Sequence, residues 1–276
     1  MCGIVGYVGE NSASPILIDG LKKLEYRGYD SAGIAVSENG KTDVVKTKGR
    51  IKNLEEKLKE VGGLSGTVGI GHTRWATHGA PTDVNAHPHK GGNGRITLVH
   101  NGIIENYIEL KTMLQKGGYV FVSETDTEVL AHLFDYYYKG DLLDAMVNVM
   151  KTVRGSYAVA ILANDKPGTI IAARKDSPLI VGLGDGENFL ASDIPAVLKY
   201  TRDCYLLEDN QIAVLTKDNV TLYDTDKNVV KKDVYHVTWD VEAAEKCGYE
   251  HFMQKEIAEQ PKAIHLSLIH ISEPTR

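Results

Sequence analysis

The chain has 276 residues, of which 42% are hydrophobic and 25% charged, enough for one large core or two modest ones. Its formal net charge of −6 and the lack of a dense Lys/Arg run argue against a nucleic-acid-binding protein, and no apolar stretch is long enough to span a membrane. Three cysteines without a CxxC pair argue against a disulfide framework or a thiolate zinc site and favour a reducing compartment.

Local signals predict the elements of the first fifty residues. Residues 2–9 form a short apolar strand, and because this run is too short for a signal peptide and no basic region precedes it, we expect a cytoplasmic protein. A helix should follow, with Ser14 as its cap and Pro15 in its first turn. Residues 31–49 predict a hairpin that turns at Asn39-Gly40.

Apolar periodicity predicts the elements of the rest of the chain. The predicted helices cover residues 51–61, 125–138 and 142–153. The predicted strands cover residues 66–75, 95–102, 156–165, 169–175, 178–184, 188–193, 211–216 and 220–225. The strands SYAVAILA and TIIAA are apolar at both alternating positions, so we expect both faces of their sheet to be covered. Antiparallel sheets packed on each other, with helices outside, satisfy this pattern.

The cysteine at position 2 directly follows the initiator methionine. Removal of Met1 would leave a thiol and a free α-amino group on one residue. Such an amine titrates at about 7.7–8.0 and a free thiol at about 8.5, so Cys2 could supply both a nucleophile and its base. The alternative is that Cys2 is a small, inert residue at the start of an edge strand.

The stretch GIGHTRWATHG covers residues 69–79 and places Arg74 just past the end of a strand. There the guanidinium could make a bidentate contact with a small carboxylate, and Trp75, Thr77 and His78 could line the same opening. A surface arginine beside a packed tryptophan is the alternative explanation of this stretch.

Asn101-Gly102 stands between a predicted strand and residues with helical spacing. At such a strand-to-helix junction, the Asn101 amide and the Gly102 N–H could both donate to one oxyanion. The alternative is a tight turn between two strands, which Asn-Gly also favours.

Thr125 and Glu128 form a capping-box pattern, which places Asp126 in the first turn of a helix. Its carboxylate could pair with the ammonium group of a substrate. It could equally serve the helix alone, because an acid at this position interacts favourably with the helix dipole.

Five histidines lie close together in the sequence: His72, His78, His87, His89 and His100. Such a cluster could form a metal site. However, no HExxH pattern occurs and acidic residues are sparse among the histidines, so we expect no metal and no other cofactor. His72 lies in a predicted strand, where a hydrogen-bonded core histidine is the common case.

Several stretches, in this order, closely resemble one family: MCGIVGYVG, LEYRGYDSAGIAV, HTRWATHG, NAHPH, HNGIIEN, SETDTE and GENFLASD. It is the glutamine–fructose-6-phosphate aminotransferase (isomerizing), or glucosamine-6-phosphate synthase, family, and the likeness is to its glutaminase domain. The resemblance covers residues 1 to about 264. It implies a class II glutamine amidotransferase domain over residues 1–240, with an α+β fold: a four-layer αββα sandwich of the N-terminal nucleophile hydrolase type.

The resemblance also implies roles for single residues. Cys2 would be the thiol nucleophile that attacks the amide of L-glutamine, with its own α-amine as the base. Asn101 and the Gly102 N–H resemble an oxyanion hole, while Arg74 would hold the α-carboxylate and Asp126 the α-ammonium group. The other matching positions are Trp75 at the ammonia gate, Thr77 and His78 near the bound glutamine, and Arg27 as a support for the nucleophile.

The chain departs from the family pattern toward its C-terminus. Two sugar-phosphate isomerase domains, which bind fructose 6-phosphate and use the ammonia in the family enzyme, are not present, so residues 241–264 are expected to be a linker toward them. Family members associate largely through those domains, so a fragment such as this one is compatible with a monomer. Residues 265–276 include SLIHISEPTR, which resembles a translated sequencing-adaptor tail. An authentic, divergent C-terminus is the alternative.

These residues and the family resemblance leave three functions to consider. The first is hydrolysis of L-glutamine to glutamate and ammonia through a cysteine thioester, as the glutaminase half of an aminotransferase. The second is a non-catalytic glutamine-binding regulatory module, which would keep Arg74 and Asp126 but would need no free N-terminus. The third is the related amidophosphoribosyl or asparagine-forming branch, against which YRGYDSAG and HTRWATHG argue.

Overall fold

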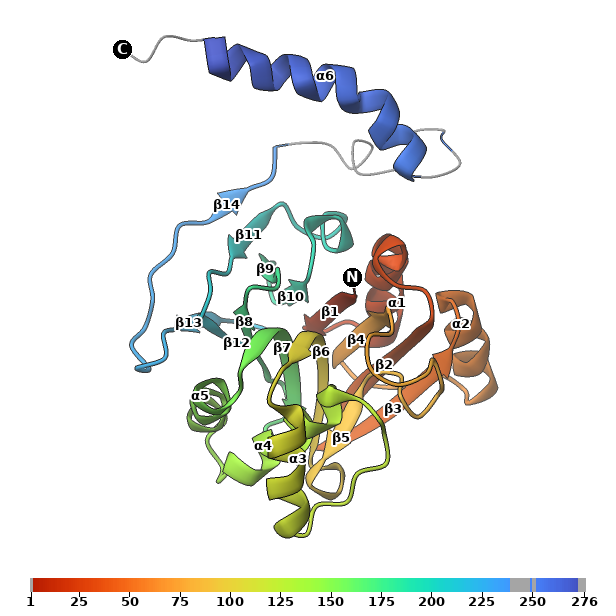
Figure 1. The fold of residues 1–276 in the computed structure, drawn as a ribbon, viewed down its shortest axis with the longest axis vertical. Helices are drawn as coiled ribbons and strands as arrows, with labels where there is room; N and C mark the ends of the chain where they lie inside the picture. The colour runs from red at the N-terminus through yellow and green to blue at the C-terminus, as the bar shows by residue number, and fades with distance from the viewer. Residues whose placement is uncertain (1, 239–248, 250–251, 273–276) are drawn as a thin grey trace. The chain divides into compact units, whose positions relative to one another are not determined.

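The computed structural model divides the chain into two compact units, Met1–Val237 and Thr238–Arg276. Within them the structure describes residues 2–238, 249 and 252–272 (Figure 1). The second unit contains helix α6 (Phe252–Ser272), which runs through the predicted boundary between linker and tail at residues 264 and 265. Apart from Tyr249, the other parts of the predicted linker and tail lie outside the described residues. No helix among those described is both long and apolar enough to cross a bilayer.

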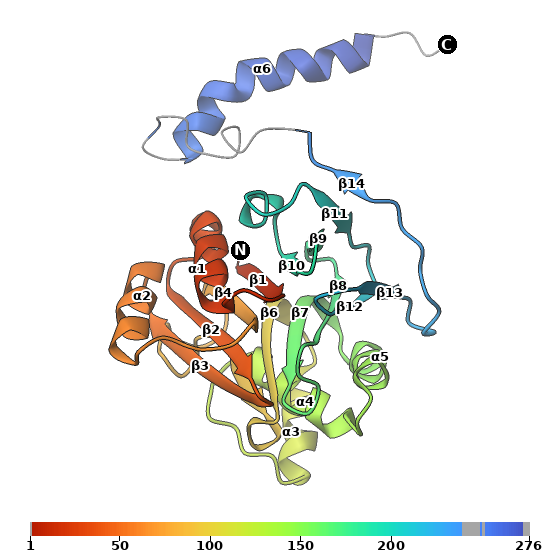
Figure 2. The same cartoon turned by 180° about the vertical axis from the view of Figure 1, so that it is seen from behind.

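Two antiparallel sheets form the centre of the first unit (Figures 1 and 2). One has the strand order β14-β11-β9-β10-β1-β4-β2-β3 and the other the order β13-β12-β8-β7-β6-β5. The strands are β1 (Gly3–Val8), β2 (Ser31–Glu38), β3 (Lys41–Lys48), β4 (Val68–Arg74), β5 (His89–Gly91), β6 (Ile96–Ile104), β7 (Gly155–Ala163), β8 (Ile170–Lys175), β9 (Ile180–Leu183), β10 (Asn188–Ala191), β11 (Asp203–Leu206), β12 (Ile212–Leu215), β13 (Val220–Tyr223) and β14 (Tyr235–His236). Short 3₁₀ helices cover Glu25–Arg27, Gly92–Gly94 and Ile194–Ala196.

Helices cover the outer face of each sheet, on opposite sides of the sandwich (Figure 1). On the larger sheet, α1 (Ala13–Lys23) packs on β1, β2 and β4, and α2 (Ile51–Glu60) packs on β2 and β3. On the smaller sheet, α4 (Asp126–Tyr137) packs on β5 and β6, and α5 (Leu142–Thr152) on β8. Helix α3 (Tyr107–Lys116) packs on α4. The order of layers is therefore αββα, which confirms the predicted four-layer sandwich.

Strand β7 illustrates why the chain folds into four layers. Tyr157 and Val159 belong to the core beneath α4 and α5, whereas Ala158 and Ala160 belong to the core between the two sheets. Successive side chains of a strand point to opposite faces, so a strand that is apolar at every position must be covered on both sides. The expectation of two covered faces for SYAVAILA is confirmed.

Some local predictions hold and others are wrong. The hairpin turn is confirmed, because Asn39 and Gly40 connect β2 to β3 with φ angles of 50° and 78°. The predicted cap is wrong: α1 begins at Ala13 with Ser12 in the capping position, so Ser14 lies inside the first turn. Strands β5, β11 and β14 have no predicted counterpart, since each has four residues or fewer and no clear alternation of apolar and polar residues.

Candidate active site

The pairing of β1 with β4 brings Cys2, His72 and Arg74 to one face of the larger sheet. The two strands are antiparallel, with Ile4 opposite His72, and Ile4 packs in the core between the sheets. Because side chains alternate along a strand, His72 and Arg74 also face the smaller sheet. Cys2 directly precedes β1 and is two residues from Ile4, so its side chain shares this face.

The Cys2 thiol contacts the peptide groups that flank Trp75. The Trp75 N–H donates to Cys2 Sγ at 3.3 Å, and the thiol lies 3.6 Å from the Trp75 carbonyl oxygen. Burial raises the pKa of the Cys2 thiol above its usual value, while the Trp75 N–H and the Arg74 charge oppose this rise. At neutral pH the sulfur is therefore a protonated thiol, and a base is needed to make it a nucleophile.

Asn101 and Gly102 lie inside strand β6, where both pair with β7. The alternative of a tight turn between two strands is wrong, since β6 is followed by helix α3. The predicted order of strand and helix is confirmed, but the strand continues to Ile104 and α3 begins only at Tyr107, so Asn101 and Gly102 lie before the junction. The pattern misleads because Gly102 has a φ of 126°, an irregular conformation within a strand. A Cβ at this position would also lie 2.1 Å from the Ser156 carbonyl oxygen, so the strand needs a glycine here.

The side chain of Asn101 extends from the smaller sheet to the start of strand β1 in the larger sheet. Its Nδ2 donates to the Cys2 carbonyl oxygen at 3.2 Å. Its Oδ1 lies 2.9 Å from His72 Nε2, which is also 3.0 Å from the His100 carbonyl oxygen. The structure therefore joins Cys2, Asn101 and His72 in one hydrogen-bonded group.

Arg74 is buried, with 4% of its surface exposed, so the alternative of a surface arginine is wrong. Its guanidinium donates to three successive carbonyl oxygens of the following loop. Nη2 donates to the oxygen of His78 and, at 3.2 Å, to that of Gly79, and Nη1 donates to that of Ala80 at 3.4 Å. Arg74 therefore fixes the shape of the loop that carries Thr77 and His78.

The other residues of this loop form the outer part of the site. The His78 ring lies with Nδ1 3.3 Å from Thr77 Oγ1 and packs edge-on against Tyr107, at 5.4 Å between ring centres. Trp75 is 48% exposed and packs edge-on against Tyr29. A half-exposed tryptophan next to the thiol is available for contact with a ligand or with another segment of protein.

Asp126 lies in the first turn of α4, as predicted. Thr125 Oγ1 accepts the Glu128 N–H at 3.3 Å, which confirms the cap. Asp126 itself accepts the N–H of Ile104, the last residue of β6, at 2.9 Å, and only 4% of its surface is exposed. The carboxylate therefore connects α4 to the end of the strand that carries Gly102.

Arg27 contacts the site indirectly. Its Nη2 forms an ion pair with Asp193 at 2.6 Å, and its Nε donates to the Tyr26 hydroxyl at 3.2 Å. The neighbouring Ser192 accepts the Ile4 N–H through its Oγ at 3.0 Å. The hydrogen bonds and the ion pair of Arg27 thus lead to the segment that holds β1, rather than to Cys2 itself.

Two residues of YRGYD that the sequence did not single out contact the backbone next to the thiol. A Cβ at Gly28 would lie 2.6 Å from the carbonyl carbon of Arg74, so no larger residue fits there. The Asp30 N–H donates to the Arg74 oxygen at 3.2 Å, and the Asp30 carboxylate accepts the Ala76 N–H. The glycine next to Arg27 was the available signal, but a long-range backbone contact leaves no local pattern.

Four of the five histidines form a buried cluster behind the site. The rings of His72 and His87 stack at 4.0 Å, and His87 packs edge-on against His89. His87 Nε2 and His100 Nδ1 lie 3.3 and 3.0 Å from the Thr127 hydroxyl. Burial lowers the pKa of all four rings, that of His72 to about 3. Among the described residues, no group of three or more potential ligands is arranged to hold a metal ion.

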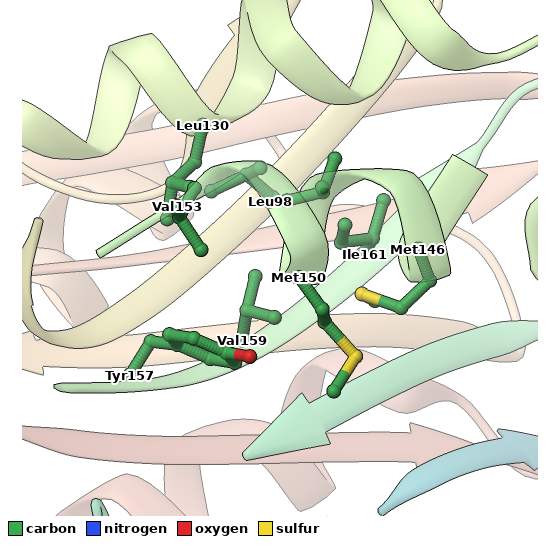
Figure 3. A pocket seen from close by; sticks show the side chains of 9 residues that line it. Leu98, Leu130, Met146, Met150, Val153, Tyr157, Val159 and Ile161 are labelled. Carbon is green, nitrogen blue, oxygen red and sulfur yellow. The ribbon is translucent and has the colours of Figure 1, made fainter. Parts of the chain in front are cut away.

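An apolar cavity lies elsewhere, between α5 and the smaller sheet (Figure 3). Met146 and Met150 of α5 point into it, and Leu130, Tyr157 and Val159 line it from α4 and β7. Its free volume is about 10 Å³, which is that of a single water-sized sphere. It is therefore a small packing gap in the core, too small for an amino acid.

Comparison with known proteins identifies the kind of domain. The family model described as "Glutamine amidotransferase domain" matches residues 72–199. The glutamine–fructose-6-phosphate aminotransferase (isomerizing) of Clostridium tetani is 61% identical over 264 residues, which is 96% of this chain and 43% of the relative. The enzyme of the same name from Clostridium perfringens is 62% identical with the same coverage. The chain thus spans less than half the length of these curated relatives.

Solved structures agree on the fold. The glutamine phosphoribosylpyrophosphate amidotransferase from B. subtilis, complexed with ADP and GMP, is 27% identical with a TM-score of 0.71, over 83% of this chain and 50% of that one. A structure titled as the allosteric regulatory enzyme of purine biosynthesis is 28% identical with a TM-score of 0.72 and the same coverage. Identity to the fructose-6-phosphate aminotransferases is about twofold higher. The chain therefore belongs to the class II glutamine amidotransferases of the N-terminal nucleophile hydrolase fold, as a homologue of the amino-terminal glutaminase part of the glutamine–fructose-6-phosphate aminotransferases.

Proposed function

We propose that the described domain hydrolyses L-glutamine to glutamate and ammonia, with Cys2 as the nucleophile once Met1 is removed. The observation that carries this proposal is the 3.2 Å contact from Asn101 Nδ2 to the Cys2 carbonyl oxygen. This contact brings a side-chain amide from one sheet to the backbone of the residue that carries the thiol on the other, which supports a role for Asn101 as an oxyanion donor. The raised pKa of the thiol calls for a base, and an α-amine that titrates at about 7.7–8.0 suits this task at neutral pH.

The reaction follows from these groups. The α-amine of the processed Cys2 takes the thiol proton as the sulfur attacks the amide carbon. Asn101 Nδ2 and the Gly102 N–H donate to the oxyanion that forms, and each such donor lowers the barrier by about 2.7–4 kcal/mol. The C–N bond then breaks, and the proton held by the amine leaves with ammonia. Water cleaves the resulting thioester, which releases glutamate and restores the thiol.

Charge complementarity supports glutamine as the substrate. Arg74 is the last residue of β4, and Asp126 accepts a hydrogen bond from the last residue of β6, the strand that carries Asn101. A buried cation and a buried anion are thus available near the thiol and Asn101. We assign Arg74 to the α-carboxylate of glutamine and Asp126 to its α-ammonium group. Thr77 and His78 are assigned to the rim around the substrate.

Two further residues have accessory roles in this proposal. Trp75 is assigned to the exit of ammonia, because it is half exposed and its N–H contacts the thiol. Arg27 is assigned a supporting role, because it is bonded to Asp193 in the segment that holds β1.

The proposal extends to the longer proteins named among the relatives. There, ammonia would be transferred to fructose 6-phosphate by a region outside these residues, and oligomers would form through that region. The described domain alone would then bind only L-glutamine, without a cofactor. We propose a cytoplasmic setting, which suits the free thiols of Cys2 and Cys204.

The test is release of glutamate from L-glutamine by the purified chain, with removal of Met1 confirmed by intact mass. The matched control is Cys2→Ala, which keeps a small residue after the methionine. Release by the native chain that is absent from the control supports the proposal, with or without added fructose 6-phosphate. Glutamine binding by the processed, folded chain without glutamate release under either condition would instead support the non-catalytic binding module.

A further inference from the structure

We propose that His72 is a positioning residue for Asn101: its Nε2–H holds the side-chain oxygen of Asn101, so that the amide nitrogen faces Cys2. The role rests on the proposed function for its catalytic consequence, although its geometry stands independently. His72 acts through Asn101 and does not itself touch the reacting atoms. The sequence indicated His72 as a hydrogen-bonded core histidine.

The bonding partners of His72 determine which of its nitrogens carries hydrogen. Nε2 lies 2.9 Å from Asn101 Oδ1 and 3.0 Å from the His100 carbonyl oxygen. A carbonyl oxygen can only accept, and Oδ1 of the amide likewise only accepts, so Nε2 must be the donor to both. The tautomer of His72 is therefore Nε2–H, as inferred from the hydrogen-bond network.

This tautomer also fixes the orientation of the Asn101 amide. With Oδ1 held by His72, Nδ2 is directed to the Cys2 carbonyl oxygen at 3.2 Å. A flipped amide would place its oxygen against the Cys2 oxygen and its NH₂ against the His72 N–H, so both contacts would become repulsive. One hydrogen of Nδ2 serves the Cys2 carbonyl, and the other can be given to an oxyanion.

The surroundings of His72 exclude its other protonation states. The ring is fully buried and stacks on His87 at 4.0 Å, and burial lowers the pKa of His72 to about 3. Its Nδ1 has no hydrogen-bond partner among the described residues. A hydrogen on Nδ1 would be a buried, unsatisfied donor, which both the Nδ1–H tautomer and the imidazolium would create.

The stacked neighbour fixes the plane of the His72 ring. His87 Nδ1 accepts the His100 N–H at 3.4 Å, and its Nε2 is 3.3 Å from Thr127 Oγ1. A ring bonded at both nitrogens keeps its plane, and stacking transmits that plane to His72. The stack on His87 and the hydrogen bonds of Nε2 therefore together set the direction of the His72 Nε2–H toward Asn101.

Kinetics of His72→Phe give the first test. Phenylalanine keeps the stacked ring but lacks the donor, so kcat for glutamine hydrolysis should fall about tenfold to a hundredfold, with little change in KM. The matched control is His132→Phe, since His132 is another buried histidine that bonds a backbone oxygen, that of Val120. That control should keep kcat. His72→Gln restores an N–H donor and should recover part of the lost kcat. No recovery of kcat in this variant, together with an equal loss of kcat in His132→Phe, would overturn the inference.

A double-mutant cycle tests whether His72 acts through Asn101. In the native background Asn101→Ala should cost about 10²–10³-fold in kcat. In the His72→Phe background it should cost much less, because the amide is no longer held in place. Losses that multiply fully would mean that the two residues act separately, and they would overturn the positioning role.

Nitrogen-15 NMR supplies a readout that does not depend on turnover. We expect the His72 ring, assigned by its loss in His72→Phe, to be the neutral Nε2–H tautomer at pH 7, and the Asn101 side-chain amide signals to shift in that variant. An Nδ1–H ring, or Asn101 signals unaffected by the substitution, would overturn the inference even in an active enzyme. Failure of the native chain to release glutamate, with these NMR results as expected, would instead count against the proposed function alone.

Discussion

Asn101 Nδ2 donates to the carbonyl oxygen of Cys2 at 3.2 Å, although the two residues are 99 positions apart in the sequence. Cys2 directly precedes strand β1 of the larger sheet, and Asn101 lies in β6 of the smaller one. The contact therefore crosses the interface between the sheets, and the geometry of the site depends on how they pack on each other.

Cys2→Ala is expected to abolish turnover while glutamine still binds. The substitution removes only the sulfur, so the hydrogen bond from Asn101 to the backbone at position 2 can remain. Loss of a nucleophile typically costs more than about 10³-fold in rate. Glutamate release and calorimetric glutamine binding measure the two properties separately. Near-native turnover by the processed variant would rule out Cys2 as the nucleophile.

Arg74→Ala is expected to raise the KM for L-glutamine by about 10-fold to 100-fold, since a charge-assisted hydrogen bond contributes about 1.5–3 kcal/mol. The same guanidinium donates to the loop oxygens of Gly79 and Ala80, so loss of loop structure must be separated from loss of the carboxylate contact.

A substrate without the carboxylate makes this separation. For 4-aminobutanamide, which keeps the amide and the ammonium group, Arg74→Ala should change kcat/KM far less than for L-glutamine. Equal losses on both substrates would assign Arg74 to the loop alone and would leave the carboxylate without its predicted partner.

Gly102→Ala is expected to lower both stability and kcat. The new Cβ would lie 2.1 Å from the Ser156 carbonyl oxygen, at a φ of 126° that costs about 1–3 kcal/mol for a residue with a side chain. Gly155 offers a matched control, with a φ of 121° and a Cβ position 2.1 Å from the Ile103 oxygen. Urea unfolding should show similar losses for both alanine variants. Only Gly102→Ala should also lose kcat when both are assayed where they are folded, and equal kcat would argue against the Gly102 N–H as an oxyanion donor.

The layered architecture was predictable from the sequence because it follows from the apolar character of successive residues along a strand. From Tyr157 to Ala163, strand β7 is apolar at each position, and only a layer on each side buries such a strand. The short strands β5 and β11 were not predictable in this way, because each has four residues or fewer and includes a charged residue, so neither shows an apolar run or a clear alternation. The strand order likewise depends on long-range pairing that no local pattern records.

The sequence predicted most of the candidate site, but not how it is held together. Cys2 and Asn101 were predicted and are in contact. Gly102 was placed at the end of a strand because its irregular φ within β6 cannot be seen from an Asn-Gly pair. Gly28 and His72 were missed as parts of the site, since their roles come from backbone approach and side-chain bonding across the fold.

The buried histidine cluster predicts loss of stability in mild acid. Burial lowers the pKa of His72 to about 3, and it also lowers those of His87, His89 and His100, whereas in the unfolded chain each titrates near 6.5. Below pH 6.5 the unfolded state therefore binds more protons than the folded state. Stability is complete above this pH and falls as the pH drops from 6.5 toward the folded pKa values.

The slope of this loss can be measured and assigned. Each histidine kept neutral in the fold contributes up to about 1.4 kcal/mol per pH unit to the free energy of unfolding. Urea unfolding at pH 7.5, 6.5 and 5.5 should show a flat region above 6.5 and a steep fall below it. His87→Phe keeps a ring that can stack on His72 but removes one titrating group, so its slope below pH 6.5 should be smaller by about one proton. An unchanged slope would mean that His87 is already charged in the folded protein, which its place in a buried cluster beside His72 and His89 argues against.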